Sequence, residues 1–332
     1  MTEAARRDRL PGGVSMADVA RRAGVSSQTV SRVSTGHPGV AASTRRQVLD
    51  AMHDLGYRPN IAARALRRGR FHAIGVVMPT LTTFANSRTA EAIAEEAALE
   101  GYSVTLIPVA AATLDELAVD GIVIMDAPRF DAANLTLPRG TRVVSVGSRS
   151  DADYPVIDTD QRGGATQAVR HLLDLGHRTV WHVTGPAESY AGELRTRAWR
   201  DVMREAGIMP PPAERGDWST LSGYQAGRRL ADEPGCTAVF AANDQMALGV
   251  LRALHERGRR VPHDVSVVGF DDIPDAAAFL PPLTTMHQNF SEVGRRCVEL
   301  LLGDIRGGPS GPGTVLVAPS LVRRASTAPP PR

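Results

Sequence analysis

The chain contains no lysine, and all 38 of its basic residues are arginine. Only two cysteines, Cys236 and Cys297, occur in 332 residues, and they form no CxxC pair. A disulfide framework, a zinc site or an iron–sulfur centre is therefore not expected, and both cysteines are predicted to lie in a core or on a helix face. No apolar run approaches the roughly 20 residues that span a bilayer. No apolar segment follows the N-terminal arginines as it would in a secretory signal. These absences predict a cytoplasmic protein without a membrane partner.

The short motifs of common enzymes are also missing. The sequence contains no GxxxxGK[ST] phosphate loop, no GxSxG elbow, no HExxH pair and no GxGxxG after its first predicted strand. The nine histidines are scattered, and His177, in a Leu-Gly-His-Arg segment before a strand, reads as structural. We therefore predict that the protein is not an enzyme and uses no cofactor or metal.

The small net charge of +2 hides an uneven distribution of charge. Residues 1–70 hold 13 arginines and five acidic residues, whereas the rest of the chain carries a net charge of −6. A basic head on an acidic body favours a polyanion-binding module joined to a second domain.

Apolar spacing predicts three short helices between residues 15 and 56. A capping-box pattern begins the first helix at Ser15, Gly24 ends it, and Ser26 begins the second. A third helix is expected from about Thr44 to Leu55. Two short helices joined by a tight turn, with a third packed across them, form a helix-turn-helix. The alternative is an ordinary small helical domain with polar faces.

The second predicted helix carries side chains suited to DNA. Ser27, Gln28, Ser31 and Arg32 would face outward, where hydroxyls and amides can meet phosphates and base edges. Residues 60–69 follow as a small, basic segment, and a helix of that length is marginal in water without a partner. DNA or the same helix of a second subunit could supply that partner, and a plain basic linker is the alternative.

From residue 73 onward, short β-branched runs alternate with helical patterns. Strands are predicted at 73–78, 103–109, 121–125, 142–146, 179–184, 237–241, 265–269, 314–318 and 320–323. Helices are predicted at 89–99, 163–175, 194–206, 223–231, 245–257 and 291–302. This alternation predicts an α/β protein with parallel sheets covered by helices on both faces, long enough for two lobes.

Several of these segments together resemble one family. The segments are DVARRAGVSSQTVSRV (18–33), GYRPN (56–60), GDWSTLSG (216–223), ANDQMALG (242–249), VVGFDD (267–272) and PPLTT (281–285). In this order they resemble the lactose-repressor (LacI/GalR) family of transcriptional regulators over roughly residues 15–326. The resemblance implies a helix-turn-helix headpiece, a hinge helix and a two-lobed core like that of periplasmic sugar-binding proteins.

The resemblance also implies domain boundaries. They are a disordered basic arm at 1–14, the headpiece at 15–60 and the hinge helix at 61–70. The N-lobe would comprise 71–158 and 289–317, and the C-lobe 159–288 and 318–326, with a disordered tail at 327–332. The tail contains no leucine heptad of the kind that makes tetramers, so a homodimer is expected.

The family's functional positions map onto this sequence as two sets. The DNA-binding set is Ser26, Ser27, Gln28, Thr29, Ser31, Arg32, Thr44, Tyr57, Asn60, Ala63 and Leu66. Ser27 and Gln28 would read bases, and Leu66 would wedge into the minor groove. The effector-binding set is Asp158, Arg195, Trp218, Asn243, Gln245, Asp271, Gln288 and Phe290. An indole face can stack on a pyranose ring while polar groups bind its hydroxyls. Phe270 is a further candidate for an apolar wall. For Trp218 the simpler alternative is core packing, and for Asp271 it is a turn or cap.

Some positions depart from the pattern of the family's lactose-responsive members. Ser27 replaces a tyrosine and Thr35 an asparagine, which leaves the operator sequence open. Met125, Gly147 and Asp158 replace an asparagine, an aspartate and a phenylalanine of the sugar cleft. About ten residues are also missing between Val109 and Gly121, so the second N-lobe helix would be very short, spanning at most 114–119.

These observations predict a repressor that binds a palindromic double-stranded DNA operator as a homodimer. A sugar inducer, a galactoside or a related glycoside, would bind between the lobes and release the protein from DNA. Three alternatives stay open: a family member that uses a corepressor, as purine-type members do, a dual activator and repressor, and an exported sugar-binding protein, which would need a signal peptide and no basic headpiece.

Overall fold

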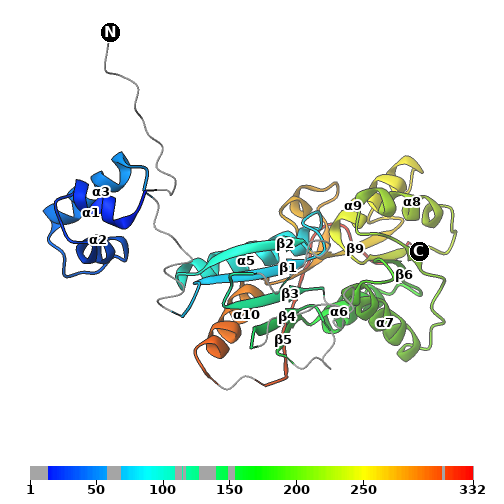
Figure 1. The fold of residues 1–332 in the computed structure, drawn as a ribbon. Helices are drawn as coiled ribbons and strands as arrows, with labels where there is room; N and C mark the ends of the chain where they lie inside the picture. The colour runs from blue at the N-terminus through cyan, green and yellow to red at the C-terminus, as the bar shows by residue number, and fades with distance from the viewer. Residues whose placement is uncertain are drawn as a thin grey trace, which may run out of the picture. The chain divides into compact units, whose positions relative to one another are not determined.

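The computed structural model describes residues 14–57, 69–108, 114, 117–126, 140–148, 154–308 and 311–331 (Figure 1). The chain divides into two units, residues 1–71 and 72–332, and each is considered by itself. The predicted hinge helix and the predicted arm lie outside the described residues, except for Gly69, Arg70 and Val14.

The N-terminal unit contains the three predicted helices. They are α1 (Met16–Arg22), α2 (Ser27–Ser34) and α3 (Ala42–Asp54). Ser15 and Asp18 form the predicted capping box at the start of α1. Gly24 adopts a left-handed backbone (φ +61°), which favours glycine at this tight turn. Val19, Val30 and Val48, one from each helix, are buried together, so the unit has its own small core.

The first sheet of the larger unit holds six parallel strands. The strands are β1 (Ala73–Met78), β2 (Ser103–Pro108), β3 (Gly121–Met125), β4 (Arg142–Val146), β5 (Val156–Thr159) and β11 (Thr314–Val317). Their order across the sheet is β11-β5-β4-β3-β1-β2. Two helices, α5 (Phe84–Leu99) and α10 (Phe290–Ile305), pack together on one face.

The other face of this sheet differs from the prediction. Within the described residues, Leu114, Leu117, Val119 and Tyr154 cover Ile122 and its neighbours, and no α-helix lies there. Residues 117–119 are not helical, so the predicted short helix does not reach Val119. The few residues between β2 and β3 still bury apolar side chains against the sheet, which is the task a crossover helix would otherwise perform.

The second sheet also has six strands and is covered by helices on both faces. Its strands are β6 (Trp181–Thr184), β7 (Glu214–Arg215), β8 (Ala238–Ala241), β9 (Ser266–Asp271), β10 (Thr284–His287) and β12 (Ser320–Val322), in the order β12-β10-β9-β8-β6-β7. Edge strand β12 runs antiparallel to β10, and the other pairs are parallel. One face carries α6 (Gln161–Asp174) and α7 (Tyr190–Glu205), and the other carries α8 (Thr220–Ala231) and α9 (Asp244–Glu256) (Figure 1).

The chain passes between the two sheets three times. It leaves the first sheet after β5 to form α6, returns after β10 to form α10, and crosses again between β11 and β12. Each lobe is therefore built from separate stretches of sequence. Ligands of parallel α/β sheets bind beyond the carboxyl ends of the strands, and three crossings at one region join both lobes there.

The prediction of a disordered tail at 327–332 is wrong for residues 327–331. Ser326 is fully buried and donates to the carbonyl oxygen of Val267 (2.6 Å). Thr327 Oγ1 lies 3.0 Å from Nε2 of His171, and the carbonyl oxygen of Ala328 lies 3.0 Å from Nε2 of His177. The proline-rich composition suggested disorder, but this segment supplies partners for two buried imidazoles and is therefore held in place.

Both cysteines are buried and free, as predicted. Cys236 packs in the core beside α8 and α9, and Cys297 packs between α10 and the first sheet. Burial raises the pKa of the Cys236 thiol to about 12, so this residue is a poor nucleophile. No helix in the described part of the chain is long and apolar enough to cross a membrane.

Candidate DNA-binding and effector sites

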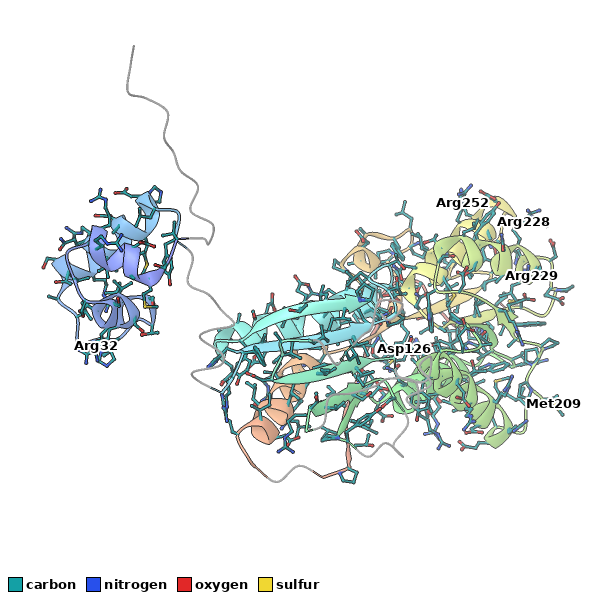
Figure 2. The ribbon with its side chains drawn as sticks, in the orientation of Figure 1. Arg32, Asp126, Met209, Arg228, Arg229 and Arg252 are labelled. Carbon is teal, nitrogen blue, oxygen red and sulfur yellow. The ribbon has the colours of Figure 1, made fainter. Side chains whose placement is uncertain are left out.

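The outer face of α2 presents the side chains predicted to meet DNA. Ser27, Gln28 and Arg32 are exposed. Arg32 lies at the surface of the headpiece (Figure 2), and it makes no ion pair with any described residue. Ser26 caps α2, because its Oγ accepts a hydrogen bond from the backbone nitrogen of Thr29 (3.1 Å). The exposed start of α2 also carries backbone N–H groups without helical partners, an arrangement suited to a phosphate.

The other predicted DNA-binding residues occupy different settings. Ser31 and Thr44 are half-buried on α2 and α3. Tyr57 packs partly buried against the small core, so it supports the headpiece fold. Asn60, Ala63 and Leu66 lie outside the described residues.

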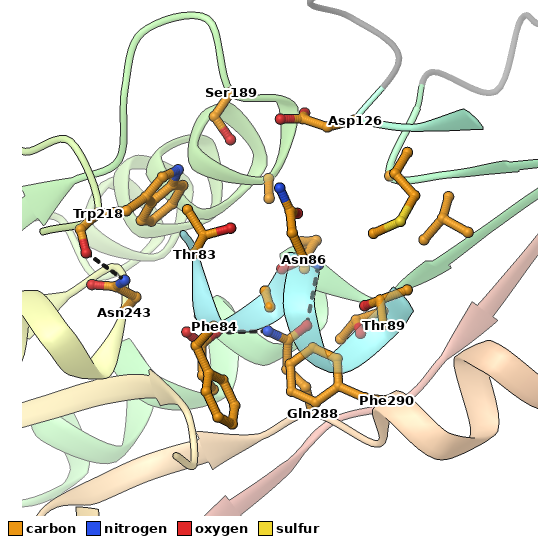
Figure 3. A pocket seen from close by; sticks show the side chains of 18 of the residues that line it. Thr83, Phe84, Asn86, Thr89, Asp126, Ser189, Trp218, Asn243, Gln288 and Phe290 are labelled. Carbon is orange, nitrogen blue, oxygen red and sulfur yellow. Dashed lines mark hydrogen bonds between the residues drawn. The ribbon is translucent and has the colours of Figure 1, made fainter. Parts of the chain in front are cut away.

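A cleft opens where the carboxyl ends of both sheets meet (Figure 3). It encloses about 850 Å³ of empty space, its open mouth included. The structure brings all eight predicted effector residues to its walls: Asp158, Arg195, Trp218, Asn243, Gln245, Asp271, Gln288 and Phe290. Met125 and Gly147, at the ends of β3 and β4, line it as well.

Arg195 is the centre of a buried polar network. Its side chain is 4% exposed and lies over the ring of Phe270, with the guanidinium carbon 3.7 Å from the ring centroid. Its Nη1 lies 3.7 Å from Oδ1 of Asp271 and also donates to the carbonyl oxygen of Ala242. Burial lowers the pKa of Arg195, whereas the nearby carboxylates of Asp271 and Asp158 oppose that change. Arg195 and Asp271 therefore form a buried pair of opposite charges in the wall of the cleft.

Gln161, at the start of α6, connects this pair to the opposite wall. Its Oε1 accepts a hydrogen bond from Nε of Arg195 (2.8 Å). Its Nε2 donates to Oδ1 of Asp158 (3.0 Å) and lies 3.4 Å from Oε1 of Gln288. Gln288 in turn donates to Asp271 (2.7 Å). One amide thus joins a carboxylate at the end of β5 to an arginine of α7, across the point where the lobes meet.

Two carboxyl groups of the cleft are strongly perturbed. Burial raises the pKa of Asp158 to about 6, against the hydrogen bond from Gln161 and the charge of Arg195. Burial likewise raises the pKa of Asp271 to about 6, although Arg195 and Gln288 favour its charged form. Asp244 lies below the cleft, bonded to Thr285 and to the backbone nitrogen of Ile273, and its pKa is also raised.

Trp218 stands on the C-lobe side of the cleft with a left-handed backbone (φ +75°). Its indole lies against Gly185, where an added Cβ would come within 2.2 Å of the ring, so glycine permits this position. Asn243 donates to the carbonyl oxygen of Trp218 (3.0 Å) and caps α9 by accepting from the backbone nitrogen of Met246 (2.9 Å). The amide of Asn243 also donates to Gln245 (2.9 Å). With its bond to the Trp218 carbonyl, Asn243 therefore holds the loop that carries the indole in place.

Phe270 does not line the cleft as a wall. It is fully buried beneath Arg195, and its ring supports the guanidinium from below. The apolar wall comes instead from Phe84 and Phe290, whose rings meet edge to face with centroids 5.8 Å apart.

The start of α5 is the part of the cleft that the sequence did not reveal. Thr83, Phe84, Asn86 and Thr89 line it, and Figure 3 shows these side chains together. The helix was predicted to begin at Thr89, which placed the first three of them in a loop. Polar residues directly after a buried strand, Thr80 onward, were the available signal. Ser189, Gln161 and Asp126 were also not predicted, and among the described residues no group is arranged to hold a metal ion.

The geometry defines a class of protein: a helix-turn-helix headpiece attached to a two-lobed α/β core with a polar and aromatic cleft between the lobes. Residues 15–60 match the family described as bacterial regulatory proteins, lacI family, and residues 169–327 match the periplasmic binding protein-like domain. The chain belongs to the lacI family of bacterial regulatory proteins and is a DNA-binding transcriptional regulator of that family.

Individual relatives agree with this assignment. The chain is 36% identical to the lactose operon repressor of Escherichia coli (strain K12), over 95% of this chain and 91% of the relative. It is 35% identical to the transcriptional regulator MalR of Streptomyces coelicolor (strain ATCC BAA-471 / A3(2) / M145), over 94% and 96% of the two chains. A crystal structure of the lac repressor dimer bound to operator and the anti-inducer ONPF superposes with a TM-score of 0.84 at 34% identity, covering 96% of this chain and 100% of that chain.

Proposed function

We propose that the protein is a transcriptional repressor that binds a pseudo-palindromic operator as a dimer and that a sugar bound in the cleft releases it from DNA. The observation that carries this proposal is the cleft itself, which takes its polar and aromatic walls from both lobes. A ligand that contacts both lobes binds one lobe arrangement better than another, and only such differential binding shifts an equilibrium.

On the DNA side, the roles follow from the family resemblance, and the exposure of Ser27 and Gln28 on α2 supports theirs. Ser27 and Gln28 are the proposed base-reading residues, since glutamine can pair with the edge of adenine. Ser26, Thr29, Ser31, Arg32, Thr44 and Tyr57 would contact phosphates or support the headpiece. Leu66 would wedge into the minor groove at the operator centre, with Asn60 and Ala63 beside the backbone. A dimer places one α2 helix in each half-site, so that operator symmetry mirrors protein symmetry.

On the effector side, a sugar fits the cleft. The indole of Trp218 would stack on a pyranose ring, and Arg195, Asp271 and Gln288 would bind its hydroxyls. Asn243 and Gln245 would hold the Trp218 loop in place. The relatives regulate different operons, and the N-lobe wall of this cleft contains Met125, Gly147 and Asp158, so the identity of the sugar is a separate question.

Fluorescence anisotropy on a labelled palindromic operator from the upstream region of the gene would test this proposal. We expect tight binding that weakens steeply with salt, because phosphate contacts release counterions. One sugar from a panel of galactosides and glucosides should abolish it. A ligand that strengthens binding would instead indicate corepression, and binding that no sugar changes would contradict the effector part of the proposal.

A further inference from the structure

The charges around the cleft do not balance. Among the described residues that line it, Arg195 is the one cation. Its nearest carboxylate is Asp271, with Oδ1 at 3.7 Å from Nη1 and both side chains 4% exposed. This pair is internally neutral, and it lies on the wall formed by the second sheet.

Asp158 lies on the opposite wall and makes no ion pair with any described residue. It is 7% exposed, and its side chain accepts a hydrogen bond from the amide of Gln161, a neutral donor. A buried carboxylate without a cation is costly. Burial raises the pKa of Asp158 to about 6, against the hydrogen bond from Gln161 and the more distant charge of Arg195, and at that pKa the group is mainly ionised at neutral pH. The cleft therefore offers an anionic position to whatever fills it.

The rest of the cleft selects the shape of the ligand. Trp218 and Phe290 provide aromatic faces, and Asn86, Thr89 and Ser189 provide neutral polar groups. A ring with several hydroxyls matches these groups, whereas a linear polyamine would leave the aromatic faces and most of the hydrogen-bonding groups unused. An uncharged sugar could donate hydroxyls to Asp158 but could not neutralise it.

We propose that the effector is an amino sugar, a pyranose or short oligosaccharide with a free amine, whose ammonium group lies against Asp158. This inference rests on the proposed function, because it names the ligand class of the same cleft. The ammonium would form the missing ion pair and a charge-assisted hydrogen bond, while the ring stacks on Trp218.

Titration calorimetry on the full-length, DNA-free protein would test the inference in matched pairs. The probes are D-glucosamine against D-glucose, D-galactosamine against D-galactose, and the β-1,4-linked glucosamine dimer against cellobiose and its N-acetylated form. At pH 6.8 the Asp158 carboxyl and most of the sugar amine are charged. We expect at least one amino sugar to bind about tenfold or more tightly than both its parent and its N-acetyl form, as a buried charged hydrogen bond requires.

The variant Asp158→Asn keeps the shape and an acceptor for Gln161 but removes the charge. We expect it to reduce the preference for the amino sugar to within about threefold, whereas Asp158→Glu should retain part of the preference. Asp174 is exposed at the end of α6, and Asp174→Asn removes the same single negative charge away from the cleft. This control should leave the preference intact. If the Asn variant does not fold, the wild-type comparison still decides.

The outcomes separate this inference from the proposed function. A parent sugar that binds as tightly as its amino form, and that releases the operator, would overturn the amino-sugar inference and leave a sugar-responsive repressor. Spermidine binding more tightly than every amino sugar would also overturn it. If no sugar of either kind bound or changed operator binding, the proposed effector class and this inference would both be wrong.

Discussion

Gln161 shows how one neutral side chain organises the cleft. It accepts from Arg195 and donates to Asp158, and all three residues are buried. No sequence pattern singled it out, because a glutamine at a helix start is common and its partners lie 34 residues ahead and at the end of the preceding strand. Asp271, Trp218 and Arg195 were identifiable from the family resemblance, whereas a residue that acts by connecting them required coordinates.

Replacing Gln161 by leucine should therefore destabilise the protein. The change removes the hydrogen-bond partner of Nε of Arg195 and of Oδ1 of Asp158, both buried. This loss costs about 1–3 kcal/mol for each unsatisfied group and more where the group is charged. Gln167→Leu, on an exposed turn of the same helix, is the matched control and should change stability by less than about 0.5 kcal/mol. Urea unfolding followed by circular dichroism measures both. Equal stability of the two variants would show that the network contributes nothing.

At the scale of elements, five of the six strands of the first sheet were predicted, β5 was missed, and the ends of many helices were wrong. The prediction for β1, β3 and β4 matches the structure residue for residue. These strands are buried on both faces, so they read as continuous apolar runs. In contrast, α5 begins five residues before its predicted start and α8 three residues before. Their first turns carry polar, cleft-facing or exposed residues, which hide the helical period.

The C-terminal segment is the element whose prediction failed most clearly, and it offers a sharp test. Ser326 Oγ accepts from the backbone nitrogen of Thr284 (2.8 Å), and Ala328 donates its backbone N–H to Ser266 (3.0 Å) while its carbonyl oxygen faces His177. Burial lowers the pKa of His177, so this imidazole is neutral at pH 7 and needs a hydrogen-bond partner rather than a counterion.

Ending the chain after Ala325 should therefore lower the free energy of unfolding by several kcal/mol. At least five buried or part-buried hydrogen bonds made by residues 326–328 lose a partner, and each unsatisfied buried group costs about 1–3 kcal/mol. Ending it after Pro329 keeps these bonds and should be nearly neutral. Thermal unfolding of the two truncated chains at pH 7.5 distinguishes them. If the chain that ends after Ala325 had the same melting temperature as the full-length protein, the segment would not be held as described.

At the scale of the whole molecule, the headpiece and the core have separate hydrophobic cores. The basic charge lies in the first 70 residues and the cleft in the rest. A change in one unit should therefore alter the binding of its own ligand alone, unless both ligands are present. When both are present, linkage requires that the sugar weaken the operator by the same factor by which the operator weakens the sugar.

This separation predicts that Gln28→Ala and Trp218→Ala each weaken the binding of a different ligand. The first should lower operator affinity by about 1–3 kcal/mol, the discrimination carried by one good base contact, and leave sugar affinity of the DNA-free protein unchanged. The second should weaken the sugar about tenfold or more, because a stacking face is lost, and leave operator affinity without sugar within about twofold. Anisotropy titrations of operator and calorimetric titrations of sugar, each with and without the other ligand, give all four affinities. Unequal coupling factors measured in the two directions would mean that the two ligands do not act on one shared equilibrium.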